Sequence, residues 1–188
     1  MRVAITGGIG SGKSHVCRLL AKRGIKVYDC DAAAERLMHD DVQLCRELSD
    51  LVGPDVYSGG VLQKAVLVRY LLMSEHNKQA INNVVHPAVA RDFINSDYTW
   101  LESAILFESG FNNRVSFDFV VCVCAPLDAR IARVMRRDNT TFEKTMEWIN
   151  RQMPQEAVAE RSDFIIENDG RKDLEVQIDQ LLIQINNK

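Results

Sequence analysis

The sequence lacks the features that mark several special classes of protein. Over 188 residues it carries a net charge of −3, which argues against a general nucleic-acid-binding or membrane-binding surface. No apolar run approaches the roughly 20 residues that a membrane-spanning helix needs. The opening MRVAITGG passes from a short apolar strand directly into glycines, without the apolar core of a signal peptide. We therefore expect a cytoplasmic protein that binds neither nucleic acid nor membrane.

The cysteines form no recognisable metal or disulfide pattern. There are five, an odd number without CxxC spacing, which argues against a zinc site and a disulfide framework. Cys122 and Cys124 stand two apart in the run FVVCVCA and would lie on one face of a strand. A redox or metal role is one interpretation of this pair. Buried reduced thiols are the favoured one, because free cysteine packs like a small hydrophobic residue.

Short apolar runs alternate with helical patterns along the chain. The predicted strands are residues 2–6, 25–31, 100–107, 119–125 and 163–167. Helical patterns cover residues 14–23 and 174–185. The runs VAIT and FVVCVC are continuously apolar, which is typical of strands covered on both faces. Alternating strands and helices predict a parallel α/β sheet flanked by helices.

Two stretches interrupt this alternation. Residues 32–96 show a helical pattern broken at 53–60, typical of an accessory lobe inserted between the second and third strands. Residues 129–161 predict two charged amphipathic helices that meet near 139–141. No repeat, low-complexity tract or Pro/Gly-rich linker is present. We therefore expect one domain, with its core in residues 1–31, 97–128 and 162–188.

Residues 7–14, GGIGSGKS, match the phosphate-binding motif G-x-x-x-x-G-K-[ST] in full. Glycines let backbone N–H groups approach phosphate oxygens, and the following helix points its positive N-terminal end at the same anion. The motif stands between a predicted strand and a predicted helix, which is the context that this mechanism requires. The residues expected to bind the triphosphate of ATP are Gly8, Gly10, Ser11, Gly12, Lys13, Ser14 and His15.

Two side chains of the motif have their own tasks. Lys13 would reach the β- and γ-phosphates, and the Ser14 hydroxyl would ligate Mg²⁺. The motif predicts the P-loop NTPase type of α/β fold, but it does not define the reaction. A GTPase switch is disfavoured: residues 50–53 match D-x-x-G but end a helical pattern, and residues 77–80, NKQA, lack the aspartate of N-K-x-D.

The second predicted strand ends in two aspartates, Asp29 and Asp31. Ligands of open α/β sheets bind at the carboxyl ends of the strands, beside the phosphate-binding loop. A kinase needs a carboxylate there to orient the acceptor hydroxyl and accept its proton. We therefore predict a catalytic role for at least one of the two. The alternative is that Asp31 caps the helix that follows.

Three arginines share one helical face at spacings of i, i+3 and i+7, namely Arg130, Arg133 and Arg137. A solvated basic stripe is one explanation. In a P-loop enzyme, arginines on a helical flap can instead close over triphosphate oxygens and exclude water. The position after the fourth strand favours such a lid.

An ordered set of motifs resembles the dephospho-CoA kinase family over nearly the whole chain. Its marks are TGGIGSGKS at residues 6–14, DCD at 29–31, HP at 86–87, LFE at 106–108, RD at 137–138, Gln152 and NDG at 168–170. The resemblance implies a single P-loop kinase domain that uses Mg²⁺ and ATP to phosphorylate the ribose 3′-hydroxyl of dephospho-CoA, giving CoA and ADP. It also implies that residues 32–96 form a helical CoA-binding insertion. Another small-molecule kinase, of the nucleoside or shikimate type, and a regulator without transfer activity are the alternatives.

The resemblance also assigns individual residues. It implies Asp31 as the base, Lys13 as part of the cradle and Arg137 as the lid arginine that approaches ATP. On the acceptor side it implies Thr6, Asp31, Lys64, His86 and Glu108. Lys64 stands where the family usually has an arginine. Glu108 could support Mg²⁺ or Lys13, or cap a turn, and Asn168 is a candidate adenine contact or part of a plain turn. We expect a monomer or a small homo-oligomer.

Overall fold

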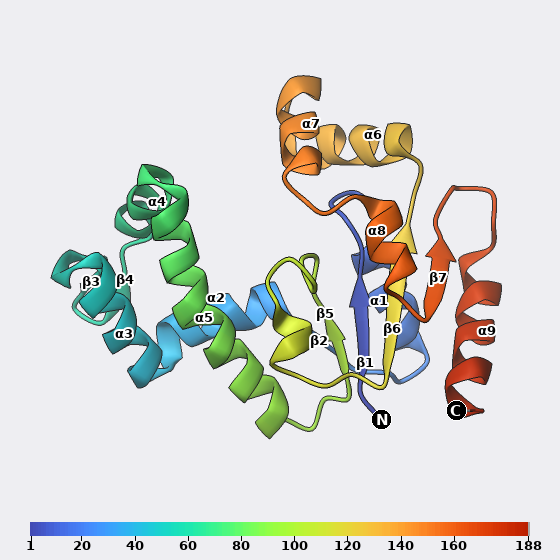
Figure 1. The fold of residues 1–188 in the computed structure, drawn as a ribbon, viewed down its shortest axis with the longest axis horizontal. Helices are drawn as coiled ribbons and strands as arrows, with labels where there is room; N and C mark the ends of the chain where they lie inside the picture. Colours follow the sequence, from blue (N-terminus) through green and yellow to red (C-terminus); the bar gives the residue numbers. More distant parts are fainter. Residues whose placement is uncertain (188) are drawn as a thin grey trace. The chain divides into compact units, whose positions relative to one another are not determined.

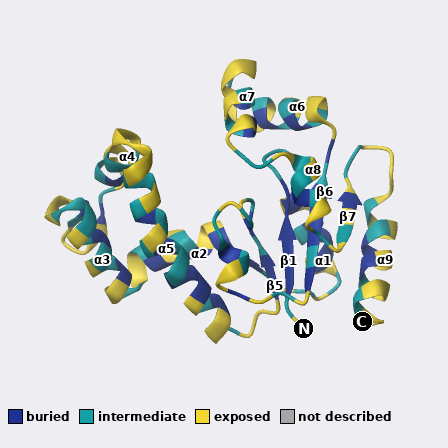
Figure 2. Cartoon of the chain, in the orientation of Figure 1, coloured by how far each residue is buried: buried dark blue, intermediate teal, exposed yellow. Residues whose placement is uncertain are grey.

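The computed structural model describes residues 1–187 and forms two compact units. The first comprises Met1–Tyr28 and the chain from Tyr98 onward, and the second comprises Asp29–Asp97. Most of the buried residues in the first unit belong to its strands and to the inner faces of its helices (Figure 2). No helix among residues 1–187 combines the length and the apolar character that crossing a bilayer requires.

A five-stranded sheet organises the first unit (Figure 1). Its order is β2-β5-β1-β6-β7. The strands are β1 (Val3–Thr6), β2 (Val27–Asp29), β5 (Trp100–Glu102), β6 (Phe119–Cys124) and β7 (Phe164–Glu167). β1 pairs in parallel with β5 and β6, and β6 pairs in parallel with β7. The prediction of a parallel α/β sheet is confirmed.

Helices cover both faces of this sheet. The core of one face joins β1, β6 and β7 to α1 (Lys13–Lys22) and α9 (Leu174–Asn186). Val121 and Val123 of β6 lie in that core, so the alternating Cys122 and Cys124 face the other side. There α8 (Gln155–Glu160) packs against β6. The two thiol sulfurs lie 3.4 Å apart, which confirms that the cysteines share a face.

Two predicted elements of the first unit differ from the structure. The strand predicted at 100–107 ends at Glu102, and turns follow it. Leu106 is fully buried, and its carbonyl accepts hydrogen bonds from the backbone of Phe111 and Asn112, so its apolar surroundings form a packed turn instead of a strand. Residues 129–161 contain parts of three helices instead of two, because Pro154 begins an extra one, α8, after α6 (Leu127–Asp138) and α7 (Phe142–Asn150).

The second unit is mainly helical, as predicted. It contains α2 (Cys30–Asp40), α3 (Val42–Val52), a short 3₁₀ turn η1 (Pro54–Val56), the hairpin β3 (Tyr57–Ser58) and β4 (Val61–Leu62), α4 (Lys64–Met73) and α5 (Glu75–Asn95). The long helix α5 packs against α2, α3 and α4. The break predicted at 53–60 corresponds to the 3₁₀ turn and the hairpin. Gly59 and Gly60 have φ values of 57° and 81°, which favour glycine in such a tight connection.

The end of β2 shows how one aspartate starts a helix. The Asp29 carboxylate accepts hydrogen bonds from the backbone N–H groups of Asp31 and Ala32, both at 2.9 Å. Asp29 is therefore the N-cap of α2, and β2 ends two residues earlier than predicted. The alternative role predicted for Asp31, capping this helix, belongs to Asp29. Asp31 lies in the first turn of α2.

We predict that Asp29→Ala lowers the free energy of unfolding by about 1 kcal/mol, because two N–H groups of α2 lose their acceptor. Urea denaturation followed by circular dichroism measures this loss. Asp29→Asn is the matched control, since an asparagine oxygen can accept the same bonds and should preserve stability. Equal destabilisation by the two substitutions would contradict the capping role.

Candidate active site

The loop between β1 and α1 has the form of an anion cradle. Gly7, Gly10 and Gly12 have φ values of 141°, 78° and 99°, a region that favours glycine. The Ser11 N–H donates to the Gly8 carbonyl at 3.1 Å and tightens the turn. The N–H groups of Gly10, Gly12 and Ser14 have no acceptor within residues 1–187. They are thus available to an anion at the N-terminus of α1.

Lys13 begins α1 and lies almost buried next to the loop. Its Nζ is 3.7 Å from Oε1 of Glu102 and 3.5 Å from the carbonyl oxygen of Gly8. Glu102 is the last residue of β5, the strand that pairs with β1. The adjacent ends of two parallel strands therefore place this carboxylate beside the lysine. Glu102 was missed at the sequence level, because the strand was predicted to continue to residue 107 and Glu102 was therefore not expected at its end.

Glu108 has a different contact from those first considered for catalysis. It lies in the turns after β5, and its Oε1 accepts a hydrogen bond from the Met153 N–H at 2.9 Å. Met153 belongs to the segment between α7 and α8. This contact gives Glu108 a structural task, which is to hold the segment between α7 and α8. The carboxylate that forms a salt bridge with Lys13 is that of Glu102.

Two arginines of α6 hold the outer side of the loop. Arg130 Nε donates to the Ile9 carbonyl at 3.0 Å, and Arg133 Nη1 lies 3.3 Å from the carbonyl oxygens of Gly10 and Ser11. We predicted that these arginines close over triphosphate oxygens. In the structure they donate to peptide carbonyls. Helix α6 therefore orients the loop through its carbonyl groups.

Asn168 and Gln152 complete this outer support. Asn168 follows β7, and its Nδ2 donates to the Ser11 carbonyl at 2.8 Å. Its own carbonyl accepts from Arg133 Nη2 at 3.0 Å. Gln152 Oε1 accepts the Ile9 N–H at 2.7 Å. The Asn168 amide thus holds the loop. From the sequence, Asn168 was considered as an adenine contact or as part of a plain turn, and this bond was not predicted.

Arg137, the third arginine of the face, has no such contact with the loop. It lies at the exposed end of α6, and its Nε and Nη2 donate to the Asp138 carboxylate at 2.8 and 2.7 Å. This charge-assisted pair lowers the pKa of Asp138 and raises that of Arg137. Two arginines of the predicted lid face are therefore anchored, and one is at the surface.

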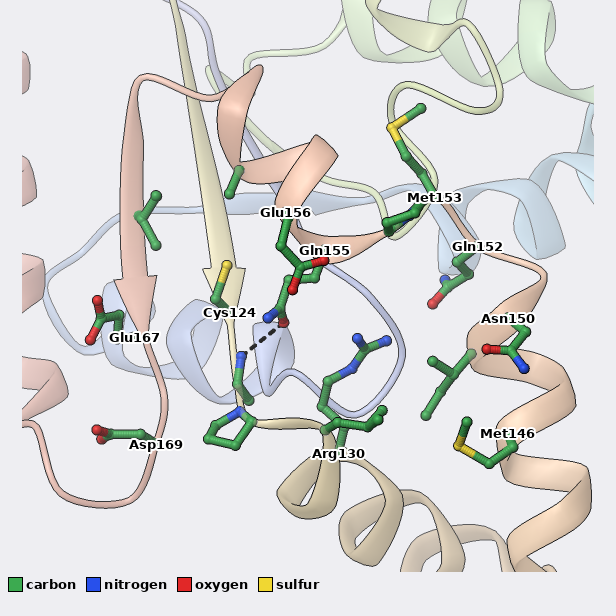
Figure 3. A pocket seen from close by; sticks show the side chains of 17 residues that line it. Cys124, Arg130, Met146, Asn150, Gln152, Met153, Gln155, Glu156, Glu167 and Asp169 are labelled. Carbon is green, nitrogen blue, oxygen red and sulfur yellow. Dashed lines mark hydrogen bonds between the residues drawn. The ribbon is translucent and has the colours of Figure 1, made fainter.

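A cavity of about 760 Å³ lies beyond Arg130, between the end of β6 and helices α6 to α8 (Figure 3). Its walls include Cys124, Arg130, Met146, Gln152 and Glu156. The Ala125 N–H donates to Gln155 Oε1 at 3.0 Å at its edge. The contact with Cys124, together with burial, raises the pKa of the Cys122 thiol. Both cysteines are free thiols, which agrees with the favoured interpretation of a packed, reduced pair.

The remaining predicted residues are divided between the units. Thr6 is buried at the end of β1, while Ser14 and His15 are exposed in the first turn of α1. The second unit holds Asp31, Lys64 and His86.

Within that unit, Asp31 is exposed in α2, and His86 is partly buried in α5 just before Pro87. Lys64 begins α4 and pairs with Glu35, which lowers the pKa of that carboxyl group.

Comparisons with known proteins identify the family of this chain. The family model for dephospho-CoA kinase matches residues 1–173. A dephospho-CoA kinase of Bacteroides fragilis is 42% identical, covering 97% of this chain and 91% of its own. A crystal structure from Thermus thermophilus is 32% identical and superposes with a TM-score of 0.79, covering 100% of this chain and 97% of its own.

A more distant match shows the fold alone. The shikimate kinase of Acinetobacter baumannii, in complex with shikimate, superposes with a TM-score of 0.61 at 14% identity, covering 100% of this chain and 94% of its own. The P-loop kinase fold is thus shared with kinases of other acceptors, whereas the family match extends over most of this sequence. The chain belongs to the dephospho-CoA kinase family, whose reaction is the last step of coenzyme A synthesis.

Proposed function

We propose that this chain transfers the γ-phosphoryl group of ATP to the ribose 3′-hydroxyl of dephospho-CoA, giving CoA and ADP. Family membership supports the acceptor and the reaction class. The observation that carries the proposal is the loop of residues 7–12, which leaves backbone N–H groups available beside Lys13. Such a loop stabilises charge on the phosphates, and phosphoryl transfer depends mainly on positioning and charge stabilisation.

The residues present fit a magnesium ion bound together with the nucleotide. Mg²⁺ usually keeps several waters and takes only one or two protein ligands when it binds substrate phosphates. The exposed Ser14 hydroxyl, in the turn that follows the loop, offers one such ligand. When bound, the ion neutralises charge on the phosphate oxygens. Lys13 and the loop N–H groups hold the triphosphate in place.

Asp31 is our candidate base. Its side chain is exposed, and Asp29 performs the capping of α2, so no capping task is assigned to Asp31. A carboxylate in this role orients the 3′-hydroxyl and accepts its proton as the phosphoryl group is transferred. In this proposal the unit of residues 29–97 binds the acceptor, with Lys64 and His86 among its contacts.

Arg137 and the segment of residues 129–161 would form the lid. The exposed guanidinium of Arg137 can exchange its carboxylate partner, Asp138, for a phosphate group, two of whose oxygens can accept the same pair of hydrogen bonds. Glu108 would support the lid through its bond to Met153. Thr6, which is buried, would be part of the acceptor site. Cytoplasmic location and a monomer or small homo-oligomer stay predictions from the sequence.

A panel of acceptors tests the proposal against its alternatives. Purified protein with Mg-ATP is offered dephospho-CoA, adenosine or shikimate, and ADP formation is followed. We expect rapid turnover with dephospho-CoA alone. Turnover with adenosine or shikimate would instead identify another small-molecule kinase. Absence of turnover with any of them, at saturating ATP, would favour a nucleotide-binding regulator.

We predict that Asp31→Asn lowers kcat by about 10²- to 10⁴-fold, because the hydroxyl loses its proton acceptor. The dissociation constant for Mg-ATP, measured by calorimetry, should hardly change. Asp29→Asn is the control, since it alters the neighbouring carboxylate but preserves the cap of α2. A parallel loss of ATP binding in Asp31→Asn would assign Asp31 to the metal or to the fold instead.

We predict that Lys13→Ala weakens Mg-ATP binding and turnover together, because the charge that meets the β- and γ-phosphates is lost. Loss of one charge-assisted contact corresponds to roughly tenfold or more in affinity. Lys22→Ala, at the exposed end of the same helix, should change neither quantity. Retention of full ATP affinity by Lys13→Ala would remove the lysine from the cradle.

A further inference from the structure

Arg130 is a buried arginine without an acidic partner at close range. The residue is 6% exposed, and a guanidinium stays protonated in proteins. Among residues 1–187, no carboxylate forms a salt bridge with it, and Glu156 acts on it only as a more distant charge. Burying a cation without a counterion is costly. The burial of this charge therefore needs an explanation, either a bound anion or a structural role.

The guanidinium packs directly against the phosphate loop at Gly8. A Cβ atom added to Gly8 would lie 2.3 Å from Arg130 Nη2 and 2.9 Å from Cζ. Gly8 is not among the glycines with positive φ, so the backbone conformation does not require glycine there. A side chain at this position would instead have to displace the Arg130 guanidinium. The absent side chain lets a positive charge lie against the backbone of the cradle.

Arg130 also fixes a peptide unit of the loop. The Ile9 carbonyl that accepts from Arg130 Nε belongs to the same peptide as the N–H of Gly10, which has no acceptor in the described chain. A hydrogen bond to a peptide carbonyl polarises its N–H and strengthens it as a donor. Gln152 holds the preceding N–H, that of Ile9. Two successive peptide units are thus oriented from the outer side.

The cavity on the other side of Arg130 does not offer it an equally suitable anion. Figure 3 shows the side chain extending from α6 toward the middle of the pocket, with Glu156 on one side and Gln152 on the other. Two further acidic residues, Glu167 and Asp169, also line this cavity. Their negative charge disfavours an anionic ligand there. The other candidate anion site is the loop of residues 7–12, and Arg130 contacts this loop directly at Gly8 and Ile9.

We propose that Arg130 is a positioning residue for the nucleotide, and that the triphosphate bound by the loop is the counterion of its buried charge. This role rests on one part of the proposed function, namely that the loop binds a nucleoside triphosphate. The charge acts through Gly8 and the peptide of Ile9 and Gly10, without a direct bond to the reacting atoms. Without nucleotide, Arg130 costs stability; with nucleotide, it stabilises the complex.

Substitutions at Arg130 separate this role from a plain structural one. We expect Arg130→Gln to weaken Mg-ATP binding by roughly ten- to hundredfold, from Coulomb's law at short range. The effect on ADP should be smaller, because ADP carries less charge. The nucleotide-free variant should resist urea as well as the natural protein or better, because a buried unpaired charge is removed. Arg130→Lys should recover most of the ATP affinity, since it restores the charge.

The exposed Arg136, on the same helix, gives the matched control. Arg136→Gln also removes one positive charge, but it should alter ATP affinity little, and that small effect should vanish at high salt. The loss in Arg130→Gln should persist at high salt, because buried charges are poorly screened. If Arg130→Gln lowers both nucleotide-free stability and ATP affinity, and Arg130→Lys fails to recover the ATP affinity, the role of Arg130 is a structural hydrogen bond and the proposal is overturned.

A double-substitution cycle tests the contact with Gly8. Gly8→Ala should displace the guanidinium and weaken ATP binding, and adding Arg130→Gln should cause little further loss because both act on one contact. Fully additive losses would overturn the proposal.

All these measurements use Mg-ATP alone, so they are separate from acceptor turnover. Unchanged ATP affinity in Arg130→Gln would refute the role of Arg130 even where dephospho-CoA is phosphorylated.

Discussion

The orientation of the peptide units in residues 8–12 is the constraint on which the rest of the site depends. A backbone cradle binds a polyanion only if its N–H groups point inward, and their carbonyls must then point outward. Buried carbonyls need donors, and these come from Arg130, Arg133 and Asn168. All three follow β6 or β7 in the chain, far from the loop in sequence. The sheet order, with β6 beside β1 and β7 beside β6, brings them to it.

The opposite neighbour of β1 supplies the matching negative charge. Glu102 ends β5 and lies 3.7 Å from Lys13, so the lysine is paired before a nucleotide arrives. A partly buried pair of this kind orients an ammonium group that would otherwise sample many rotamers. On the β6 side, Arg130 is buried without a salt bridge among the described residues. The loop thus has a cation with an acidic partner on one side. On the other side lie Arg130 and Arg133, which form no salt bridge among the described residues, so the excess positive charge is concentrated at the cradle.

Local patterns in the sequence predicted what local physics determines. The glycine-rich motif, the parallel sheet and the shared face of Cys122 and Cys124 follow from spacing over a few residues, and the structure has all three. The predicted end of β5 was wrong, because the apolar Leu106 is buried in a turn and not in a strand. The partners of Lys13 and Ile9 were not predictable from spacing. They are set by strand order and helix packing, which join residues about 90 to 140 positions apart.

Helix α6 is a rigid link between the loop and Arg137, the arginine of the lid that we propose. Arg130 and Arg133 anchor its first half to the loop, and Arg137 stands four residues beyond Arg133. At 1.5 Å per residue, four residues advance about 6 Å along a helix, just over one turn. Since the anchored turns cannot shift without breaking their bonds to the loop, the backbone of Arg137 is held at a nearly fixed distance from it. In the lid that we propose, Arg137 would therefore reach a phosphate by rotating its side chain away from Asp138. Any movement of α7 relative to α6 would occur at the connection that contains Asn139, whose φ is 48°.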